Sequence, residues 1–286
     1  MIDEINRFVN CIRRRSPNAH TYQDYRCDLQ QFLAVVGDHP PDEIGFQDVD
    51  RFIADQSQRG LKPATINRRL TAVISLYTFL AAENPDLVCP VLPYRHMLRT
   101  YRRLPRPVPD EKLRRFLAVV KDSRDKAIFL LMLRCGLRIS EAANLRLQDL
   151  YLNEARPRLL IHGKGSKERS VYLSPQAAFA LRRYLAERPV SASESVFLNY
   201  KLEGLATIGI QKRLEKYRAE AGIHLTAHQL RHSFANDLVA AGAPVTTIQK
   251  LMGHTWVTTT QAYIAANDPK VQQDFYAAVK QMEGWQ

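Results

Sequence analysis

The segment between residues 87 and 109 constrains the fold most, because it separates two stretches with regular hydrophobic patterns. It holds five prolines and five arginines but no acidic residue. Proline lacks a backbone donor and clashes with the preceding helical turn, so this composition disfavours regular helix. At roughly 150 residues per domain, a chain of 286 residues is expected to form two domains. We therefore predict a helical domain at 1–90, an extended basic linker at 91–108 and a second domain at 109–286.

Apolar residues recur every three or four positions through the first 85 residues, which is the period of amphipathic helices. The stretches 22–36 and 66–80 show this period clearly, and a further apolar stripe covers 5–12. A shorter helix is expected to stop at Gly60, because glycine readily adopts the left-handed conformation that ends helices. These patterns predict a compact bundle of about four helices.

Helical patterns return after the linker at 111–120, 126–135 and 140–145. The second of these is expected to end at Gly136. Ser140 stands at the expected start of the third, where a hydroxyl can cap the first turn.

Two β-type runs, 159–162 and 169–173, flank a turn that contains glycine and lysine, which predicts a hairpin. Residues 147–152 are a candidate third strand. From Pro175 to about Gln281 the pattern predicts helix again. The expected fold class is therefore mainly α, with a small antiparallel β-sheet in the second domain.

Positive charge predominates in this chain. It carries 41 Lys and Arg against 29 Asp and Glu, a formal net charge of +12. This excess favours a polyanionic partner, most commonly nucleic acid, although some cationic proteins bind no particular polyanion. The linker arginines are expected to lie along a phosphate backbone, with a solvated loop as the alternative. They are Arg95, Arg99, Arg102, Arg103 and Arg106.

Several classes of protein do not fit the sequence. No apolar run approaches the roughly 18–20 residues that span a bilayer, and acidic residues stand where a secretory signal would be basic. The four cysteines are far apart and lack C-x-x-C spacing, which fits reduced thiols in the cytosol rather than a disulfide scaffold or zinc ribbon. We therefore expect a cytoplasmic protein with no membrane association.

Four short clusters contain polar side chains that packing alone does not require. Each has a simple explanation by itself: a surface ion pair, a solubilising turn, or a residue packed in a helix. Their joint occurrence in one order favours a functional site. In chain order they are Arg138 with Glu141, Lys164 with Lys167, His228 with Arg231, and His254 with Tyr263.

Together these side chains form a set suited to phosphoryl transfer without metal or cofactor. Arg138 and Arg231 are expected to hold the non-bridging oxygens of a phosphodiester and to neutralise charge in the transition state. Glu141 lies three residues after Arg138, close enough to orient it. His228 and His254 are suited to donate hydrogen bonds or to move protons near neutral pH.

Tyr263 is the candidate nucleophile, and Lys164 the candidate acid that protonates a leaving 5′ oxygen. A phenol with an ordinary pKa near ~10 attacks weakly until cations and a base stabilise its phenolate. Attack on a DNA phosphate would give a 3′-phosphotyrosyl bond, which conserves bond energy and allows the strand to be rejoined without ATP.

The order R-x-x-E, K in a hairpin, H-x-x-R, G-H and Y resembles the tyrosine recombinase (phage integrase) family. The stretches GLRISEAANL, HGKGSKERSVYL, HQLRHSFANDLVAAG and LMGHTWVTTTQAYIAA are similar to its motifs, particularly in Xer-type and transposon-borne members. The N-terminal half resembles the family's core-binding domain in TYQDYRCDLQQFL and LKPATINRRLTAVISLYTFL.

The resemblance implies a four-helix, SAM-like core-binding domain followed by a catalytic domain. It implies the catalytic set Arg138, Lys164, His228, Arg231, His254 and nucleophile Tyr263, with Glu141 in support. Lys164 is preferred over Lys167 for the catalytic lysine. The DNA-binding side chains implied are Arg68, Arg69, Arg95, Arg99, Arg102, Arg103, Arg106 and Lys167.

The resemblance also implies a site-specific recombinase that exchanges strands through a Holliday junction. Its partners would be a double-stranded DNA recombination site and three further copies in a homo-tetramer, with a paralogous recombinase as a possible addition. An apolar stripe near the chain end, at about 270–286, fits an oligomerisation helix that docks into a neighbouring subunit, the alternative being packing on its own domain.

Two other functions compete with this interpretation. The first is a non-catalytic DNA-binding accessory protein on the same fold, against which the complete catalytic set argues. The second is a metallohydrolase built on His228-x-x-x-His232, which has zinc-ligand spacing but lacks the glutamate after the first histidine and an obvious third ligand.

Overall fold

The computed structural model describes residues 1–15, 21–100, 108–162 and 168–253. The chain divides into two compact units, Met1–Arg102 and Arg103–Gln286. In the described ranges, every helix is too short or too polar to cross a bilayer.

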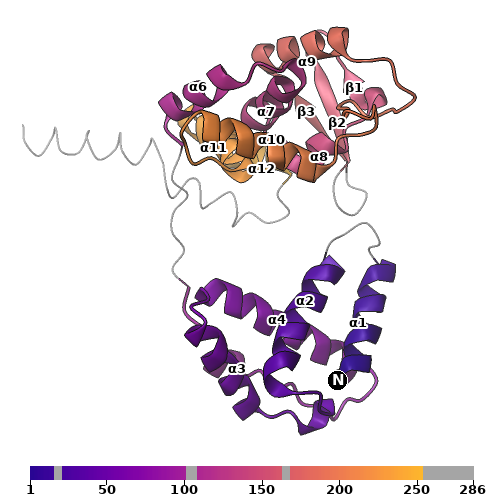
Figure 1. Cartoon of the computed structure of the whole chain (residues 1–286), viewed down its shortest axis with the longest axis vertical. Coiled ribbons are helices and arrows are strands. Elements are labelled where there is room, and N and C mark those ends of the chain that lie inside the picture. Colours follow the sequence, from indigo (N-terminus) through magenta and orange to yellow (C-terminus); the bar gives the residue numbers. More distant parts are fainter. Residues whose placement is uncertain (16–20, 101–107, 163–167, 254–286) are drawn as a thin grey trace, which may run out of the picture. The chain divides into compact units, whose positions relative to one another are not determined.

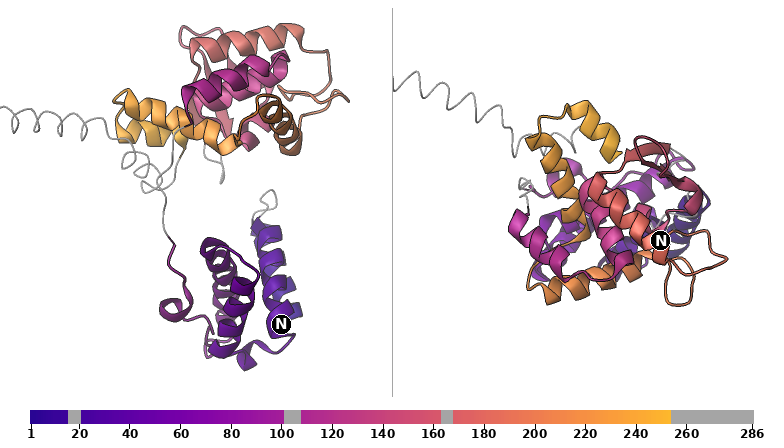
Figure 2. Two further views of the ribbon diagram at one scale, coloured as in Figure 1. Left: turned by 60° about the vertical axis from the view of Figure 1, so that its left-hand side comes forward. Right: turned by 90° about the horizontal axis from the view of Figure 1, so that it is seen from above.

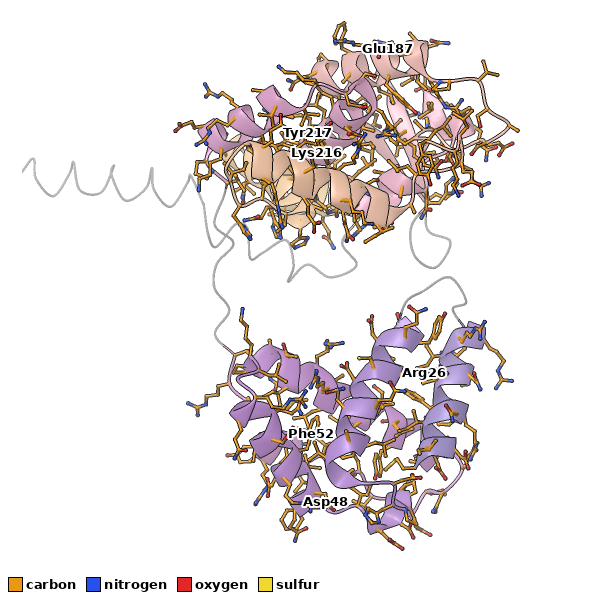
Figure 3. The ribbon with its side chains drawn as sticks, in the orientation of Figure 1. Arg26, Asp48, Phe52, Glu187, Lys216 and Tyr217 are labelled. Atoms are coloured by element: carbon orange, nitrogen blue, oxygen red, sulfur yellow. The ribbon has the colours of Figure 1, made fainter. Side chains whose placement is uncertain are left out.

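The N-terminal unit is the predicted bundle of four helices (Figure 1). They are α1 (Ile2–Arg15), α2 (Thr21–Val36), α3 (Phe46–Gln58) and α4 (Pro63–Ala81), with a short 3₁₀ turn at Pro41–Glu43. The apolar stripes predicted from the sequence form the core. Phe32 and Phe52 meet edge to face in it with ring centroids 5.1 Å apart, and Phe52 is labelled in Figure 3. Burial of such rings supplies much of the stability of a small helical bundle.

The first part of the linker packs on this unit. Val91 is buried, and the Asn67 side chain donates to the Leu98 carbonyl at 2.8 Å and accepts from the Leu98 N–H at 2.9 Å. Residues Pro93–His96 form a short helix, α5, so the predicted extended conformation is wrong there. Proline is well tolerated at the first position of a helix, because no backbone donor is required there.

The C-terminal unit begins with three helices, α6 (Asp110–Val119), α7 (Ser123–Cys135) and α8 (Ile139–Ala143). A 3₁₀ turn at Leu147–Asp149 leads into the sheet, which consists of β1 (Leu150–Tyr151), β2 (Arg158–His162) and β3 (Glu168–Tyr172). The remaining described helices are α9 (Pro175–Glu187), α10 (Thr207–Glu220), α11 (Ala227–Ala240) and α12 (Val245–Met252).

The predicted hairpin and third strand are confirmed. The strands pair antiparallel in the order β1-β2-β3, with Leu159 opposite both Leu150 and Val171. Leu159, Ile161 and Val171 are buried and share a core with α7 and α9. Helix α7 is buried along its middle, and α9 lies alongside it (Figure 2).

Residues 188–206 are irregular, so the prediction of continuous helix from Pro175 is wrong there. The Arg188 guanidinium donates to the carbonyls of Ser193 at 2.8 Å, Ser195 at 2.9 Å and Val196 at 3.1 Å. These bonds replace the regular backbone ladder, and helix resumes at Thr207. Farther along α10, Tyr217 donates to the buried Asp125 carboxylate at 3.0 Å (Figure 3).

Candidate active site

The site is built on a sharp break between α7 and α8. Gly136 follows α7 directly and has a φ of +71°, a left-handed conformation that favours glycine. A Cβ atom at this position would lie 2.4 Å from a ring carbon of Phe234 on α11. The chain therefore turns closely against α11 and places Arg138 at the start of α8.

Arg138 caps α8 together with Glu141. The Glu141 Oε2 atom accepts from the Arg138 backbone N–H at 2.8 Å, and Oε1 accepts from Arg138 Nη1 at 2.7 Å. The predicted cap Ser140 is wrong, because it lies inside the helix and Arg138 occupies the cap position. The carboxylate three residues into the helix satisfies the free N–H group, as in a capping box.

Glu141 is 8% exposed and lies among three arginines. Both its oxygens accept from Arg169, at 2.8 Å each, and Arg231 Nη1 lies 3.8 Å from Oε2. Burial by itself would raise the pKa of Glu141, but the hydrogen bonds and charges of Arg169 and Arg138 lower it to about 2. Since one carboxylate faces three guanidinium groups, positive charge remains in excess around it, which is suited to binding an anion.

The same three arginines hold the end of α12. Three consecutive carbonyl groups there each accept from a different guanidinium, in a region where helix carbonyls carry partial negative charge. Leu251 accepts from Arg169 Nε at 3.1 Å, Met252 from Arg231 Nη2, and Gly253 from Arg138 Nη2 at 3.0 Å. Arg231 Nη1 also donates to the Gly136 carbonyl. The arginine cluster thus joins the α7–α8 break to the residue that precedes His254.

His228 lies in the first turn of α11, where Thr226 caps the helix by accepting from Gln229 N–H at 3.2 Å. The pKa of His228 lies below its ordinary value, because nearby protein removes part of the ring from water and because Arg231 and Arg138 are positively charged. A histidine neutral at physiological pH is able to accept or relay a proton. Its ring meets that of His232 edge to face at 3.9 Å.

A second polar group braces the hairpin base. His162 Nε2 lies 3.0 Å from an oxygen of the buried Asp149, and Nδ1 lies 3.1 Å from Glu168 Oε1. The hydrogen bond with Asp149 and the negative charges of both carboxylates raise the pKa of His162. This brace ties together the ends of β2 and β3, between which the chain carries Lys164 and Lys167.

Comparison with known proteins identifies the family. A family model described as the phage integrase family matches residues 108–270, and one described as its N-terminal SAM-like domain matches residues 5–84. The chain belongs to the phage integrase family. The family predicted from the sequence is thereby confirmed, and with it the enzyme class, a tyrosine recombinase.

Two curated relatives of this tyrosine recombinase cover most of its length. Tyrosine recombinase XerC of Neisseria gonorrhoeae is 32% identical over 272 residues, which cover 90% of this chain and 88% of the relative. Tyrosine recombinase XerD of Lacticaseibacillus casei is 35% identical over 259 residues, covering 85% and 86% respectively. A solved structure of XerH site-specific recombinase bound to palindromic difH substrate has a TM-score of 0.76 at 22% identity, covering 91% of this chain and 80% of that one. This last likeness shows the fold.

The structure brings four of the predicted site residues into one cluster. Arg138, Glu141 and Arg231 are joined through the carboxylate and the end of α12, and both arginines influence the pKa of His228. Seven further predicted site residues lie outside the described part of the chain. They are Lys164, Lys167, His254 and Tyr263, together with the linker residues Arg102, Arg103 and Arg106.

The sequence analysis assigned no role to Arg169, although this residue begins a predicted strand and lies in the stretch HGKGSKERSVYL. The available signal was strand register: Arg169 lies opposite the buried Ile161, and directly opposed residues share a face of the sheet. An arginine on the inward face requires an internal partner. That partner is Glu141.

Several predicted DNA-binding arginines already have partners in the N-terminal unit. Arg68 lies 2.7 Å from the buried Asp28 carboxylate, and Arg69 contacts both Asp28, at 3.7 Å, and the buried Gln56. Arg95 pairs with Asp50 at 2.6 Å, while Arg99 is exposed. The positive charges of Arg68, Arg69 and Arg95 are therefore partly neutralised by neighbouring carboxylates, whereas Arg99 is exposed to solvent.

The described ranges contain no group of three or more His, Cys, Asp or Glu side chains placed to hold a metal ion.

Proposed function

We propose that this protein is a site-specific DNA recombinase that cleaves and rejoins strands through a 3′-phosphotyrosyl bond at Tyr263. The observation that carries the proposal is the arginine cluster around Glu141. Relatives that are more than 30% identical over most of the chain are named tyrosine recombinases, and the XerH site-specific recombinase with the same fold is bound to palindromic difH substrate.

The arginines would bind the scissile phosphate in two different ways. The Arg138 side chain is 40% exposed, so its guanidinium is accessible to a phosphate oxygen. Arg231 is 4% exposed, and both its terminal nitrogens donate to backbone carbonyls. Because so little of Arg231 is exposed, a phosphate oxygen would reach its guanidinium only after the groups that cover it move.

The remaining groups would manage protons. His228 lies next to both arginines, and its lowered pKa keeps it neutral and able to exchange a proton with the reacting groups. Lys164, between β2 and β3 in the sequence, would protonate the leaving 5′ oxygen, and His254 would bind the same phosphate. Tyr263 would attack phosphorus in line, so the P–O5′ bond breaks as the tyrosyl P–O bond forms. No cofactor enters this scheme.

The protein would act on a double-stranded recombination site as a homo-tetramer, through a Holliday junction, with a paralogous recombinase as a possible partner. The recombination reaction would serve integration, transposition, inversion or dimer resolution, and would take place in the cytoplasm. The apolar stripe at about 270–286 would link subunits. A chain truncated after residue 269 should then bind a single DNA site normally but form no paired-site complex by native gel; unchanged pairing would refute this role.

The competing candidate is a DNA-binding accessory protein without catalysis. A pool of duplexes with randomised sequence and a nick in one strand distinguishes the two, because a nick lets the short cleaved fragment diffuse away and traps the covalent complex. The recombinase should give a band that survives denaturing gels and forms in EDTA. A protein that only shifts the duplexes on native gels would be the accessory protein.

A further inference from the structure

We propose that Arg169 is a positioning residue of the cleavage reaction, which holds Glu141 and, through it, the guanidinium groups of Arg138 and Arg231. This inference rests on the proposed function, because it assigns Arg169 a part in the same site. Neither the motif order nor the spacing of the predicted catalytic residues includes Arg169.

The first support is the geometry of the Arg169–Glu141 pair. Nη1 donates to Oε1 and Nη2 to Oε2, each at 2.8 Å, which is the two-bonded fork that fixes a carboxylate plane. Arg138 Nη1 reaches only Oε1, and Arg231 lies nearest Oε2. Rotation of the carboxylate would break the bond with Arg138 Nη1 and change the charge that faces Arg231. The two bonds from Arg169, together with the Arg138 backbone N–H, oppose that rotation.

The second support is the contact with the end of α12. Arg169 Nε donates to the Leu251 carbonyl at 3.1 Å. A Cβ atom at Gly253 would lie 3.1 Å from three atoms of the Arg169 side chain, so the helix end packs directly on the guanidinium. The side chain is 14% exposed. It thus joins β3, α8 and α12, and the chain reaches Lys164 just before β3 and His254 just after α12.

A lysine at this position would not do the same work. Its ammonium is a compact point charge, whereas the planar guanidinium holds its three donating nitrogens, Nε, Nη1 and Nη2, in fixed directions. Misplacement of reacting groups by about 1 Å can cost on the order of a hundredfold in rate. We therefore expect Arg169→Lys to lower the rate of adduct formation about a hundredfold, with DNA affinity within about threefold of wild type.

Single-turnover cleavage assays measure the rate for Arg169→Lys. The substrate is the nicked duplex recovered from covalent complexes in the randomised pool. Arg158→Lys is the matched control, because Arg158 lies on the neighbouring strand β2 and pairs with Glu154 instead. It should cleave at the wild-type rate. An Arg169→Lys protein that cleaves at the wild-type rate, or an equal loss in Arg158→Lys, would overturn the proposal.

A pH profile separates positioning from general structural damage. With its pKa about 2, Glu141 is ionised throughout the range from pH 5 to 8. Titration of Glu141 should therefore not lower the wild-type rate of adduct formation anywhere in that range. Arg169→Lys should raise that pKa, and its adduct rate should fall further as the pH drops towards 5. In the double variant Arg169→Lys/Glu141→Gln, this extra pH dependence should disappear, and the adduct rate should be little lower than in Arg169→Lys alone. If the rate losses of the two single variants multiply in the double variant, the two residues act independently and the inference is contradicted.

If wild-type protein forms no adduct, the proposed function is refuted, but the role of Arg169 is still open to test. Nuclear magnetic resonance then tests whether Arg169 holds the Glu141 carboxylate. The Glu141 carboxyl resonance is assigned in protein with ¹³C-labelled glutamate by its absence in Glu141→Gln. Between pH 7 and 4 it should not titrate in wild type and should begin to titrate in Arg169→Lys. An identical titration in both proteins would overturn the role of Arg169.

Discussion

Arg169 and Glu141 are joined by two parallel hydrogen bonds, each 2.8 Å long, across 28 residues of sequence. This pair connects the strand that follows the hairpin turn to the helix that presents Arg138. Its buried carboxylate is the common centre for three guanidinium groups, and those groups in turn hold the end of α12. The cluster therefore arranges the predicted phosphate-binding groups before any DNA is bound.

Replacing Arg231 with alanine should lower the rate of adduct formation by roughly 10²–10³-fold, while leaving DNA affinity within a few-fold of wild type. The variant also leaves the Gly136 and Met252 carbonyls without a donor, which should lower the free energy of unfolding by about 2 kcal/mol. The control is Arg134→Ala, which removes an exposed pair with Asp237. Single-turnover cleavage and urea unfolding check both effects, and retained cleavage would contradict the role of Arg231.

Replacing Gly136 with alanine should destabilise the C-terminal unit by about 2 kcal/mol or more, because φ is +71° there and the added Cβ would meet Phe234 at 2.4 Å. Gly242 has a similar φ but open space around it, so Gly242→Ala should cost less, about 1 kcal/mol. Chemical unfolding of the two variants measures the difference. Equal losses would show that the contact with Phe234 is unimportant.

The His162 brace should make the hairpin more stable at mildly acidic pH. Because the pKa of His162 is raised in the folded protein, its stabilising effect is complete below the ordinary histidine value near 6.5 and is lost as pH rises through the folded value. The difference in urea midpoint between wild type and His162→Gln should therefore be larger at pH 6 than at pH 8.5. A difference that grows with pH would contradict the brace.

Two linker arginines should behave differently in DNA binding. Arg99 is exposed, so Arg99→Ala should weaken binding to all duplexes and reduce the slope of log affinity against log salt by about 1. Arg95 is paired with Asp50 and lies over the Phe46 ring, so Arg95→Ala should change the slope less and destabilise the N-terminal unit instead. Fluorescence anisotropy across a salt series compares them, and equal slopes would show that the pairing has no effect on DNA binding.

Local patterns made parts of this molecule predictable. The four-helix bundle and the hairpin follow from apolar periodicity and turn residues, and the Arg138–Glu141 contact follows from a spacing of three along one helix start. Arg169 could not be placed in the same way, because its contact with Glu141 depends on how a strand packs against a distant helix. Arg69 also requires tertiary information, since Asp28 and Gln56 reach it from two other helices.

The irregular segment 188–206 also could not be predicted from local sequence patterns. Its conformation is held partly by Arg188, which donates to three carbonyls, and partly by backbone bonds to distant residues, such as that from Val196 N–H to the Leu145 carbonyl. Because the sequence has helical spacing of apolar residues on both sides of the segment, it predicted one continuous helix. Contacts of individual polar side chains thus account for the differences at Arg169, Arg69 and 188–206.

The most direct test of the account is to locate the covalent bond to DNA. Wild-type protein and Tyr263→Phe are incubated with a nicked duplex selected from the randomised pool, and the adduct is digested and mapped by mass spectrometry. The account predicts that wild-type protein carries nucleotide on the peptide containing Tyr263 and that Tyr263→Phe binds the duplex but forms no adduct. An adduct on another residue, or one that persists in Tyr263→Phe, would contradict it.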